Sequence, residues 1–532
     1  MTAWLSTALL ISILVFNSLH RTAIAAEMSD VGSISFPTSA ATEPAAAFTR
    51  GVAILHSFGW KQAIAQFKAA QTLDPDFAMA YWGEALCYNH PLLREQDLQT
   101  PRSVLQRLGP TLEARLAKAP TPREKGFLLA VDALFFGTGS YGERRTAYMK
   151  SMRSLHEQFP NDDEVAAFYA LSLLSAAGPA GSNASALNVL GGAIALEISA
   201  RNPNHPGAVH YTIHAFDDPI HARLALPAAR VFADIAGAVS HAQHMPTHIF
   251  IQLGMWEEVS ASNQSAFDVA TRLWEPGDAA GDMTHALDWG QYGDLQRGDY
   301  ERARLWIERM KGVAQRNAGQ TRVQNALPRV KARYILESRQ WQTHPITDKS
   351  SAVELLATGI SAVKLNDLEL AKKAVRRLKK LAKDASQDTD TSYYARTSQP
   401  LQIMHNEVAG MLALARGQRD RGLRYLAEGV AIAESMRPPN GAPNPVKPVH
   451  ELYAEALLEV GQPHDAIAQY ERSQYRMPNR PSSLLGLARA YIATGDHQAA
   501  RVQYVKLAEI LKNTDSVVLL EATDYLNANK MN

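Results

Sequence analysis

The stretch HDAIAQYERSQYRMPNR, residues 464–480, is followed by a related stretch, HQAARVQYVKLAEI, residues 497–510. In both, a small residue is followed four positions later by a tyrosine, and a glycine precedes the unit. The matched positions are Ala466 with Ala500, Tyr470 with Tyr504 and Gly461 with Gly495. Alanine to alanine, the two units are 34 residues apart, so the chain contains a repeat.

A 34-residue period with a small residue, an aromatic residue and a late proline is typical of the tetratricopeptide repeat, a pair of antiparallel helices. Small residues let the two helices approach closely, the aromatic fills the space between neighbouring pairs, and the proline ends the second helix. The segment 51–75 carries the same signature at Gly51, Ala63, Phe67, Ala70 and Pro75.

Weaker copies occur through the rest of the chain, and their spacing is irregular. They centre on Val259, Ala303, Ala371 and Gly422. Alternating strand patterns are missing from the sequence. We therefore predict an all-α, tetratricopeptide-like solenoid of antiparallel helical hairpins, with insertions, curled around a concave face.

The bulk composition is that of a folded protein without a strong electric field. The chain has 532 residues, of which 46% are hydrophobic and 20% charged, and its formal net charge is +1. Such a balance gives no long-range attraction for nucleic acid or an anionic membrane. The basic run of residues 372–383 alternates with apolar residues at helical spacing, which favours a solvated repeat helix over a nucleic-acid surface.

The N-terminus has the features of a secretory signal peptide. An apolar run from Ala3 to Phe16 is too short to span a bilayer comfortably, and Ala23 to Ala25 form a small-x-small cleavage signature. Against this interpretation, Arg21 follows the apolar run and no basic residue precedes it. We predict a signal peptide at residues 1–25, a periplasmic or secreted mature chain, and no membrane span in that chain. Cys87 is the only cysteine, so no intrachain disulfide can form.

The remaining segments are assigned by composition and periodicity. Residues 26–45 form an extended lead-in, 46–383 contain repeats with a histidine-rich centre, 384–400 form a loop, and 401–532 contain the C-terminal repeats. Residues 437–448 carry five prolines and must leave the helical pattern. This proline-rich loop is either a rigid connector or a cover that narrows a binding face.

The densest cluster of potential metal ligands lies in HAQHMPTHIFIQLGMW, residues 241–256, and in VHYTIHAFDDPIHA, residues 209–222. The histidines concerned are His210, His214, His241, His244 and His248. Histidines three, four or seven positions apart share one face of a helix. Two such pairs from neighbouring repeats, His210 with His214 and His244 with His248, would make a four-imidazole site suited to zinc, copper, nickel or iron.

Proline 246 decides how this cluster is built. Either a helix kinks at Pro246, or a helix starts there and leaves His241 and His244 on the incoming segment. Asp217, Asp218 and His221 lie close enough in sequence to act as ligands or as acceptors for imidazole N–H groups. The alternative is that these histidines are ordinary core residues, which is the usual role of a single histidine on an apolar helix face.

Other polar residues in apolar surroundings are weaker candidates. His56 and His90 could add to the metal site, and Glu84 is a carboxylate in an apolar run that is costly to bury without a partner. Further possible ligand-binding residues are Asp217, His285, His450 and Glu451. His450 and Glu451 do not form a metalloprotease helix, because position 454 is Ala and not His. Cys87 lies in an apolar run, which favours a packed thiol over a nucleophile.

Longer stretches of the chain resemble a group of largely uncharacterised bacterial tetratricopeptide-repeat proteins. The resemblance rests on residues 56–92, on HYTIHAFDDPIHARLALPAARVFADIA, on HAQHMPTHIF, and on PNPVKPVHELYAEALLEVGQP with RMPNRPSSLLGLARA, and it covers most of the mature chain. It implies the helical-repeat fold and a dedicated site rich in His, Trp and Pro, and it implies no particular reaction.

Two functions of different classes follow. The first is an exported scaffold that binds a protein or small-molecule partner on its concave face, with no nucleic acid involved. The second is a metal-binding protein or metalloenzyme whose histidine cluster holds zinc, copper or iron and could activate water or dioxygen.

Overall fold

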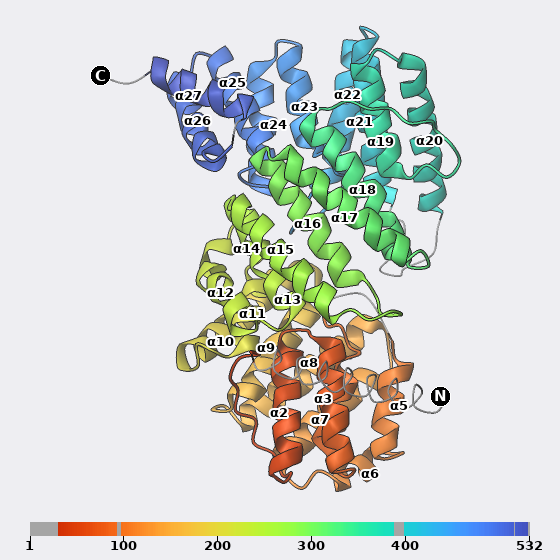
Figure 1. Cartoon of the computed structure of the whole chain (residues 1–532), viewed down its shortest axis with the longest axis vertical. Coiled ribbons are helices and arrows are strands. Elements are labelled where there is room, and N and C mark those ends of the chain that lie inside the picture. The colour runs from red at the N-terminus through yellow and green to blue at the C-terminus, as the bar shows by residue number, and fades with distance from the viewer. Residues whose placement is uncertain (1–29, 93–96, 388–397, 515, 530–532) are drawn as a thin grey trace, which may run out of the picture. The chain divides into compact units, whose positions relative to one another are not determined.

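The computed structural model describes residues 30–92, 97–387, 398–514 and 516–529 (Figure 1). Regular structure in these ranges is helical, without a strand, and consecutive helices pack side by side as hairpins. The predicted all-α repeat fold is therefore confirmed. The predicted signal peptide lies outside the described residues. In the described ranges, no helix combines the length and apolarity needed to cross a bilayer.

The chain divides into two compact units. The first comprises residues 1–215 and 227–245, and the second comprises residues 216–226 and 246–532. The division falls inside α12 (Ala222–Ile235) and between α13 and α14, whereas our domain boundary from the sequence lay at residues 384–400.

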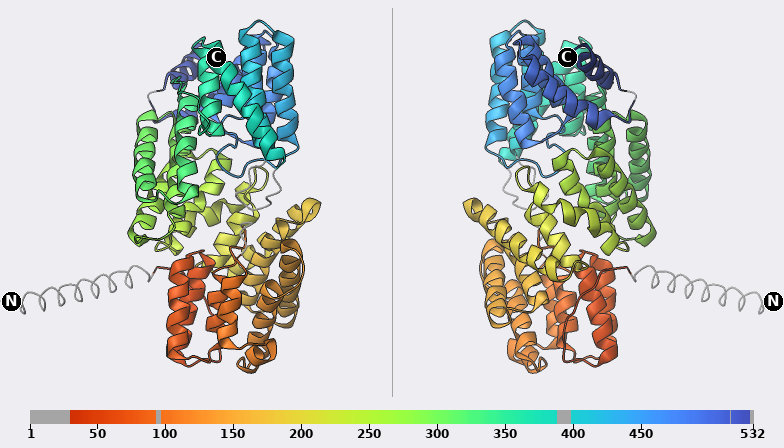
Figure 2. Two further views of the ribbon diagram at one scale, coloured as in Figure 1. Left: turned by 90° about the vertical axis from the view of Figure 1, so that its right-hand side faces the viewer. Right: turned by 90° about the vertical axis from the view of Figure 1, so that its left-hand side faces the viewer.

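The first unit is a succession of helical hairpins that starts with α2 and α3, packed on each other (Figures 1 and 2). Its helices are α2 (Thr42–His56), α3 (Trp60–Leu73), α4 (Ala78–Leu86), α5 (Gln99–Leu108), α6 (Leu112–Ala117), α7 (Pro122–Phe135), α8 (Tyr141–Gln158), α9 (Asp163–Ala177), the short 3₁₀ helix η1 (Gly181–Asn183), α10 (Ala184–Arg201), α11 (Pro206–Ala215) and α13 (Ser240–His244).

An aromatic core joins the extended lead-in to the first hairpins. The lead-in is extended from residue 30 to Ala41, and α2 begins at Thr42, four residues before the predicted start of the repeats at residue 46. Phe36 of the lead-in is buried with its ring centroid 4.9 Å from that of Phe48 and 5.3 Å from that of Phe127. The lead-in is thus part of the core of this unit.

The repeat signature works as the sequence predicts. Phe67 on α3 is fully buried, and it faces two glycines, Gly51 on α2 and Gly83 on α4. A Cβ atom at Gly83 would lie 2.3 Å from the Phe67 ring, and one at Gly51 would lie 2.8 Å from it. Only residues without a side chain allow three helices to meet on this phenylalanine.

The second unit continues with longer helices. They are α14 (Pro246–Leu253), α15 (Trp256–Leu273), α16 (Gly281–Arg297), α17 (Tyr300–Arg316), α18 (Thr321–Ser338), α19 (Ala352–Lys364), α20 (Leu368–Ser386), α21 (Ser398–Ala415), α22 (Arg419–Glu434), α23 (Val449–Glu459), α24 (Pro463–Arg476), α25 (Pro481–Ala493), α26 (His497–Leu511) and α27 (Val517–Ala528). The central residues of the weaker repeats, Val259, Ala303, Ala371 and Gly422, are all buried.

Of the two segments predicted to be loops, one is helical at both of its ends and the other is non-helical. Helix α20 runs to Ser386 and α21 begins at Ser398, so both ends of the predicted loop 384–400 are helical, and residues 388–397 lie outside the described residues. The proline-rich stretch 437–448 is non-helical between α22 and α23, as predicted. Most of its later residues, from Pro445 to Pro448, are buried.

We predict that Gly486→Ala destabilises the second unit. A Cβ atom there would lie 2.1 Å from the ring of Tyr470, which is itself buried, so overpacking should cost about 1–3 kcal/mol. The matched control is Gly312→Ala on α17, where the nearest side-chain atom would be 3.6 Å away and the free energy of unfolding should rise by up to about 1 kcal/mol. Urea unfolding measures both, and equal effects would contradict the packing argument.

Candidate metal centre

Helix α11 places two histidines on one face in the first unit. Pro206 opens the helix, where its fixed backbone angle and missing N–H are tolerated. His210 and His214 then follow one turn apart, and their ring centroids are 4.7 Å from each other. His210 is fully buried, whereas His214 is partly exposed.

The short helix α13 brings a third histidine to this face. Helix α13 ends at His244 and α14 begins at Pro246, so the chain starts a new helix at the proline instead of kinking a longer one. His241 on α13 lies with its ring centroid 5.1 Å from that of His210 and 6.2 Å from that of His214. Each of the three imidazoles offers a nitrogen, and these nitrogens all lie within 4.8 Å of one another. A tetrahedral ion bound at roughly 2.1 Å needs nitrogens about 3.4 Å apart, so ion binding would require the rings to move closer together.

The tautomer of His210 is set by a backbone carbonyl of another helix. Nδ1 of His210 lies 2.6 Å from the carbonyl oxygen of His56. Because a carbonyl only accepts hydrogen bonds, Nδ1 carries the proton and Nε2 carries the lone pair in the neutral ring. A metal-binding imidazole commonly donates its other N–H to a carbonyl or carboxylate in this way.

Phe58 covers all three imidazoles. Its ring centroid lies 4.4 Å from that of His210, 5.3 Å from that of His241 and 5.9 Å from that of His214. Phe58 follows the end of α2 with a φ of 57°, a left-handed conformation that costs a non-glycine residue about 1–2 kcal/mol. This strained position directs the aromatic ring onto the histidines and is the type of backbone outlier found at functional sites.

A buried network of four side chains lies behind the cluster. The ring of His56 contacts the Tyr211 hydroxyl through Nδ1 at 2.7 Å and Oε2 of Glu164 through Nε2 at 2.9 Å. Nδ1 of His205 accepts the Ala208 N–H at 3.1 Å, and its Nε2 lies 3.2 Å from Oε1 of Glu164. The carboxylate of Glu164 thereby has an imidazole ring beside each oxygen.

The electrostatics of this network follow from its burial. Burial lowers the pKa of His56, although Glu164 opposes the change. Burial also acts to raise the pKa of Glu164, but the interactions with His56 and His205 outweigh it and lower that pKa to about 2. Glu164 is therefore ionised, and burial favours the neutral form of His56. His56, Glu164 and His205 also lie close enough together to hold an ion, and Oε1 of Glu164 and Nε2 of His205 have no hydrogen-bond partner among the described residues.

Close approach of α11 to His56 requires a glycine. A Cβ atom at Gly207 would lie 2.5 Å from Nδ1 of His56. A glycine at position 207 is therefore needed for α11 to come close enough to α2 for His210 to contact the carbonyl of His56.

His90 lies outside the three-histidine cluster. Its ring centroid is 5.1 Å from that of Trp60, which stacks on Phe58. The buried guanidinium of Arg145 donates to the carbonyls of the turn that holds His90, including those of Asn89 and His90. His90 therefore supports the aromatic wall behind Phe58.

The predicted set of His210, His214, His244 and His248 is grouped differently in the structure. His241 completes the group of His210 and His214, and His244, buried at the end of α13, has its ring centroid 6.3 Å from that of His241. His248 belongs to the second unit, where its Nδ1 lies 2.7 Å from Oδ2 of Asp217. His221 instead contacts Asp218, at 2.7 Å.

Two candidate ligand-binding residues, Glu84 and His450, are held in polar contacts of their own. Buried Glu84 accepts from Arg107 at 2.5 Å and from Gln71 at 2.7 Å, which compensates for its burial. His450 contacts Gln469 and Glu434. A further candidate, His285 on α16, lies with its ring centroid 5.2 Å from that of Trp289. Cys87 is buried, and burial raises the pKa of its thiol, as expected of a packed cysteine.

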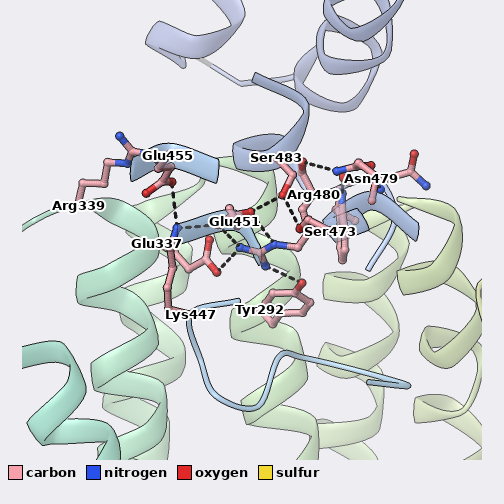
Figure 3. A network of polar contacts seen from close by, with 12 residues as sticks. Tyr292, Glu337, Arg339, Lys447, Glu451, Glu455, Ser473, Asn479, Arg480 and Ser483 are labelled. Carbon is pink, nitrogen blue, oxygen red and sulfur yellow. Dashed lines mark hydrogen bonds and ion pairs between the residues drawn. The ribbon is translucent and has the colours of Figure 1, made fainter. Parts of the chain in front are cut away.

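Glu451 belongs to a buried ionic network centred on Arg480 (Figure 3). Arg480 donates to both oxygens of Glu451 at 3.1 Å, to Glu337 at 2.8 Å and to the hydroxyl of Tyr292 at 2.9 Å. Lys447 of the proline-rich loop adds a contact to Glu451 at 2.8 Å. The two cations hold the pKa of Glu451 far below its usual range despite its burial. The network ties α16, α18, α23 and the α24–α25 turn together.

The sequence analysis missed several residues that shape these sites. They are Phe58, Glu164, His205, Trp289 and Arg480. Glu164 was detectable, because it opens the apolar run VAAFYALSLL and so presents the same cost of burial that drew attention to Glu84. The other four carry no such local signal.

We predict that acid weakens the first unit through Glu164. In the folded chain its pKa is about 2, below the ordinary value of 4.5. The ionised carboxylate therefore adds about 3 kcal/mol to the free energy of unfolding. This stabilisation is fully present above pH about 4.5 and is lost as the pH falls toward 2. The lowered pKa of His56 acts in the same direction below pH about 6.5. Glu164→Gln should therefore reduce the free energy of unfolding at pH 7, and its difference from wild type should shrink by pH 3. The exposed Glu157→Gln serves as the control in urea unfolding, and a pH-independent difference would refute this assignment.

A second prediction concerns the ionic network. Arg480→Met leaves Glu451 and Glu337 facing each other without their main cation, and should lower the free energy of unfolding of the second unit by about 3–5 kcal/mol. Arg153→Met breaks an exposed pair with Glu157 and should change the free energy of unfolding by less than about 1 kcal/mol. Thermal unfolding followed by circular dichroism compares the two variants. Equal stability of both would mean that the network is dispensable.

Comparisons with known proteins add little to this picture. No protein-family model and no curated protein matches the chain. Among solved structures, it is similar to a tetratricopeptide-repeat protein from Parabacteroides merdae, with 10% identity over 54% of this chain and 98% of that one and a TM-score of 0.29. It is also similar to a human IFIT1 dimer with m7Gppp-AAAA, with 11% identity over 92% of this chain and 93% of that one and a TM-score of 0.34. At such values these likenesses concern the helical-repeat fold and carry no argument about the site.

Proposed function

We propose that this protein binds a divalent transition-metal ion through His210, His214 and His241. The observation that carries the proposal is the hydrogen bond from Nδ1 of His210 to the carbonyl of His56, because it leaves Nε2 as the nitrogen with the lone pair in the middle of three imidazoles. Imidazole ligands suit zinc, copper, nickel and iron.

The number of protein ligands favours an ion with an exchangeable position. His214 and His241 are partly exposed, whereas the Nε2 atom of each of the three rings is itself buried. Three protein ligands with a fourth position open to water are typical of catalytic zinc sites, whereas structural sites are closed by four protein ligands. A metal in such a site supplies a polarised water molecule or a Lewis acid. This chain's contribution would be to fix His210 and to shield one side of the ion with Phe58.

Metal binding should stabilise the full chain and depend on the three histidines. With Zn²⁺ at about 100 times its dissociation constant, the free energy of unfolding should rise by about 2.7 kcal/mol. His241→Ala should weaken the binding at this site by at least about tenfold, and lowering the pH below about 6.5 should release the ion as imidazoles protonate. Elemental analysis of the dialysed protein and calorimetric titration with Zn²⁺ measure these effects.

The exposed His344→Ala is the control, since it removes an imidazole far along the chain from the cluster. Circular dichroism checks that each variant is folded. Unchanged Zn²⁺ stoichiometry and affinity in His241→Ala and in His214→Ala would reject the three-histidine site.

The binding of a protein partner is a second proposed function. Helix α10 exposes Val189, Leu190 and Leu196, each more than two-fifths accessible, which is unusual for neighbouring apolar residues on a repeat helix. Co-purification of a partner with the wild-type protein but not with Leu190→Glu tests this proposal.

We also propose that the chain is exported and belongs to the bacterial group that it resembles. The apolar N-terminal run and the HAQHMPTHIF motif support this. Cell fractionation and N-terminal sequencing of the mature protein test export.

A further inference from the structure

We propose that His248 and His285 in the second unit form another binding site for a divalent transition-metal ion, oriented by Asp217. This site uses residues different from those of the first unit. It can therefore be tested separately from the proposed three-histidine centre.

The orientation of His248 is set by a buried carboxylate. Oδ2 of Asp217 lies 2.7 Å from Nδ1 of His248, and the side chains are 6% and 11% exposed, respectively. A carboxylate accepts and the imidazole donates, so Nδ1 carries the proton and Nε2 holds the lone pair in the neutral ring. Carboxylate, histidine and metal in this order form a common arrangement in metal sites, in which the carboxylate fixes the ring and raises its basicity.

A tryptophan supports both imidazoles. His285 and Trp289 lie one turn apart on α16, and their ring centroids are 5.2 Å apart. The ring of His248 packs on the same indole at 4.5 Å. One nitrogen of His285 lies within 4.8 Å of a nitrogen of His248. Two ring nitrogens are thus held close together on a common aromatic surface.

The proline-rich loop fixes this tryptophan in place. A Cβ atom at Gly441 would lie 2.3 Å from Cζ2 of Trp289, so the loop backbone rests against the indole. Lys447 in the same loop is tied to Glu451 and Glu455 in the network of Figure 3. The support of the two histidines therefore extends to the C-terminal repeats of this unit.

A buried oxygen of Asp217 is the independent observation that points to a cation. Its Oδ1 is buried and has no hydrogen-bond partner among the described residues. A buried carboxylate is costly when its charge is not balanced. An ion on the far side of the His248 ring would balance that charge through the imidazole. With two protein imidazoles, the ion keeps further positions for water or a small ligand, and copper, nickel and zinc suit such nitrogen donors.

The test uses the full chain in a His214→Ala/His241→Ala background, which removes the first site. Titration with Cu²⁺ should still show one bound ion per chain and should quench tryptophan fluorescence. Adding His285→Ala should weaken this binding at least about tenfold, and adding Asp217→Asn should weaken it by about 10–100-fold. Trp289→Phe should retain binding and lose part of the quenching, whereas His344→Ala should change neither.

The outcomes separate the two sites. Cu²⁺ affinity that is unchanged by both His285→Ala and Asp217→Asn, in proteins folded by circular dichroism, would overturn the second site and show that the histidines are core residues. In the otherwise wild-type chain, His285→Ala should lose one ion of two and leave the ion on His241. If His214→Ala/His241→Ala loses no ion but His285→Ala does, the three-histidine proposal fails and this one stands.

Discussion

His56 joins a buried carboxylate to the three-histidine cluster. Its ring donates to Glu164, and its backbone carbonyl accepts from His210. Glu164 is buried between two imidazoles, with a hydrogen bond from His56 and a contact of 3.2 Å to His205, and these contacts connect α9 with α2 and with the residue before α11. The position of His210, and with it the geometry of the cluster, therefore depends on a carboxylate that is not itself part of the cluster.

The same chemical device occurs in both units. In the first unit a carbonyl accepts the Nδ1–H of His210, and in the second unit the carboxylate of Asp217 accepts that of His248. Each time the acceptor comes from a segment outside the histidine's own helix, and each time the opposite nitrogen retains its lone pair. In both units an aromatic ring packs against the histidines, Phe58 against His210 in the first unit and Trp289 against His248 in the second.

Two other buried carboxylates are compensated by cationic side chains. Glu84 is compensated by Arg107, and Glu451 is compensated by Arg480 and Lys447. A buried charge that loses its partner destabilises a fold strongly, whereas the intact pair contributes little on its own. The network around Arg480 connects residues of α16, α18 and α23. Polar residues in apolar stretches are consequently a good sign of a constraint, but not of a ligand.

The repeat fold follows from the sequence, because small and aromatic residues recur at helical spacing and this local pattern dictates which helix faces pack. The spacing of His210 and His214 likewise predicts that they share a face, and Pro246 predicts that a helix begins or breaks there. The tertiary structure was needed to show that His241 lies beside His210, that His248 contacts Asp217, and that Glu164 contacts His56, 108 positions away. Helical periodicity fixes the direction of a side chain around its own axis, but partners on other helices depend on how the hairpins stack, which the packing of the whole unit sets.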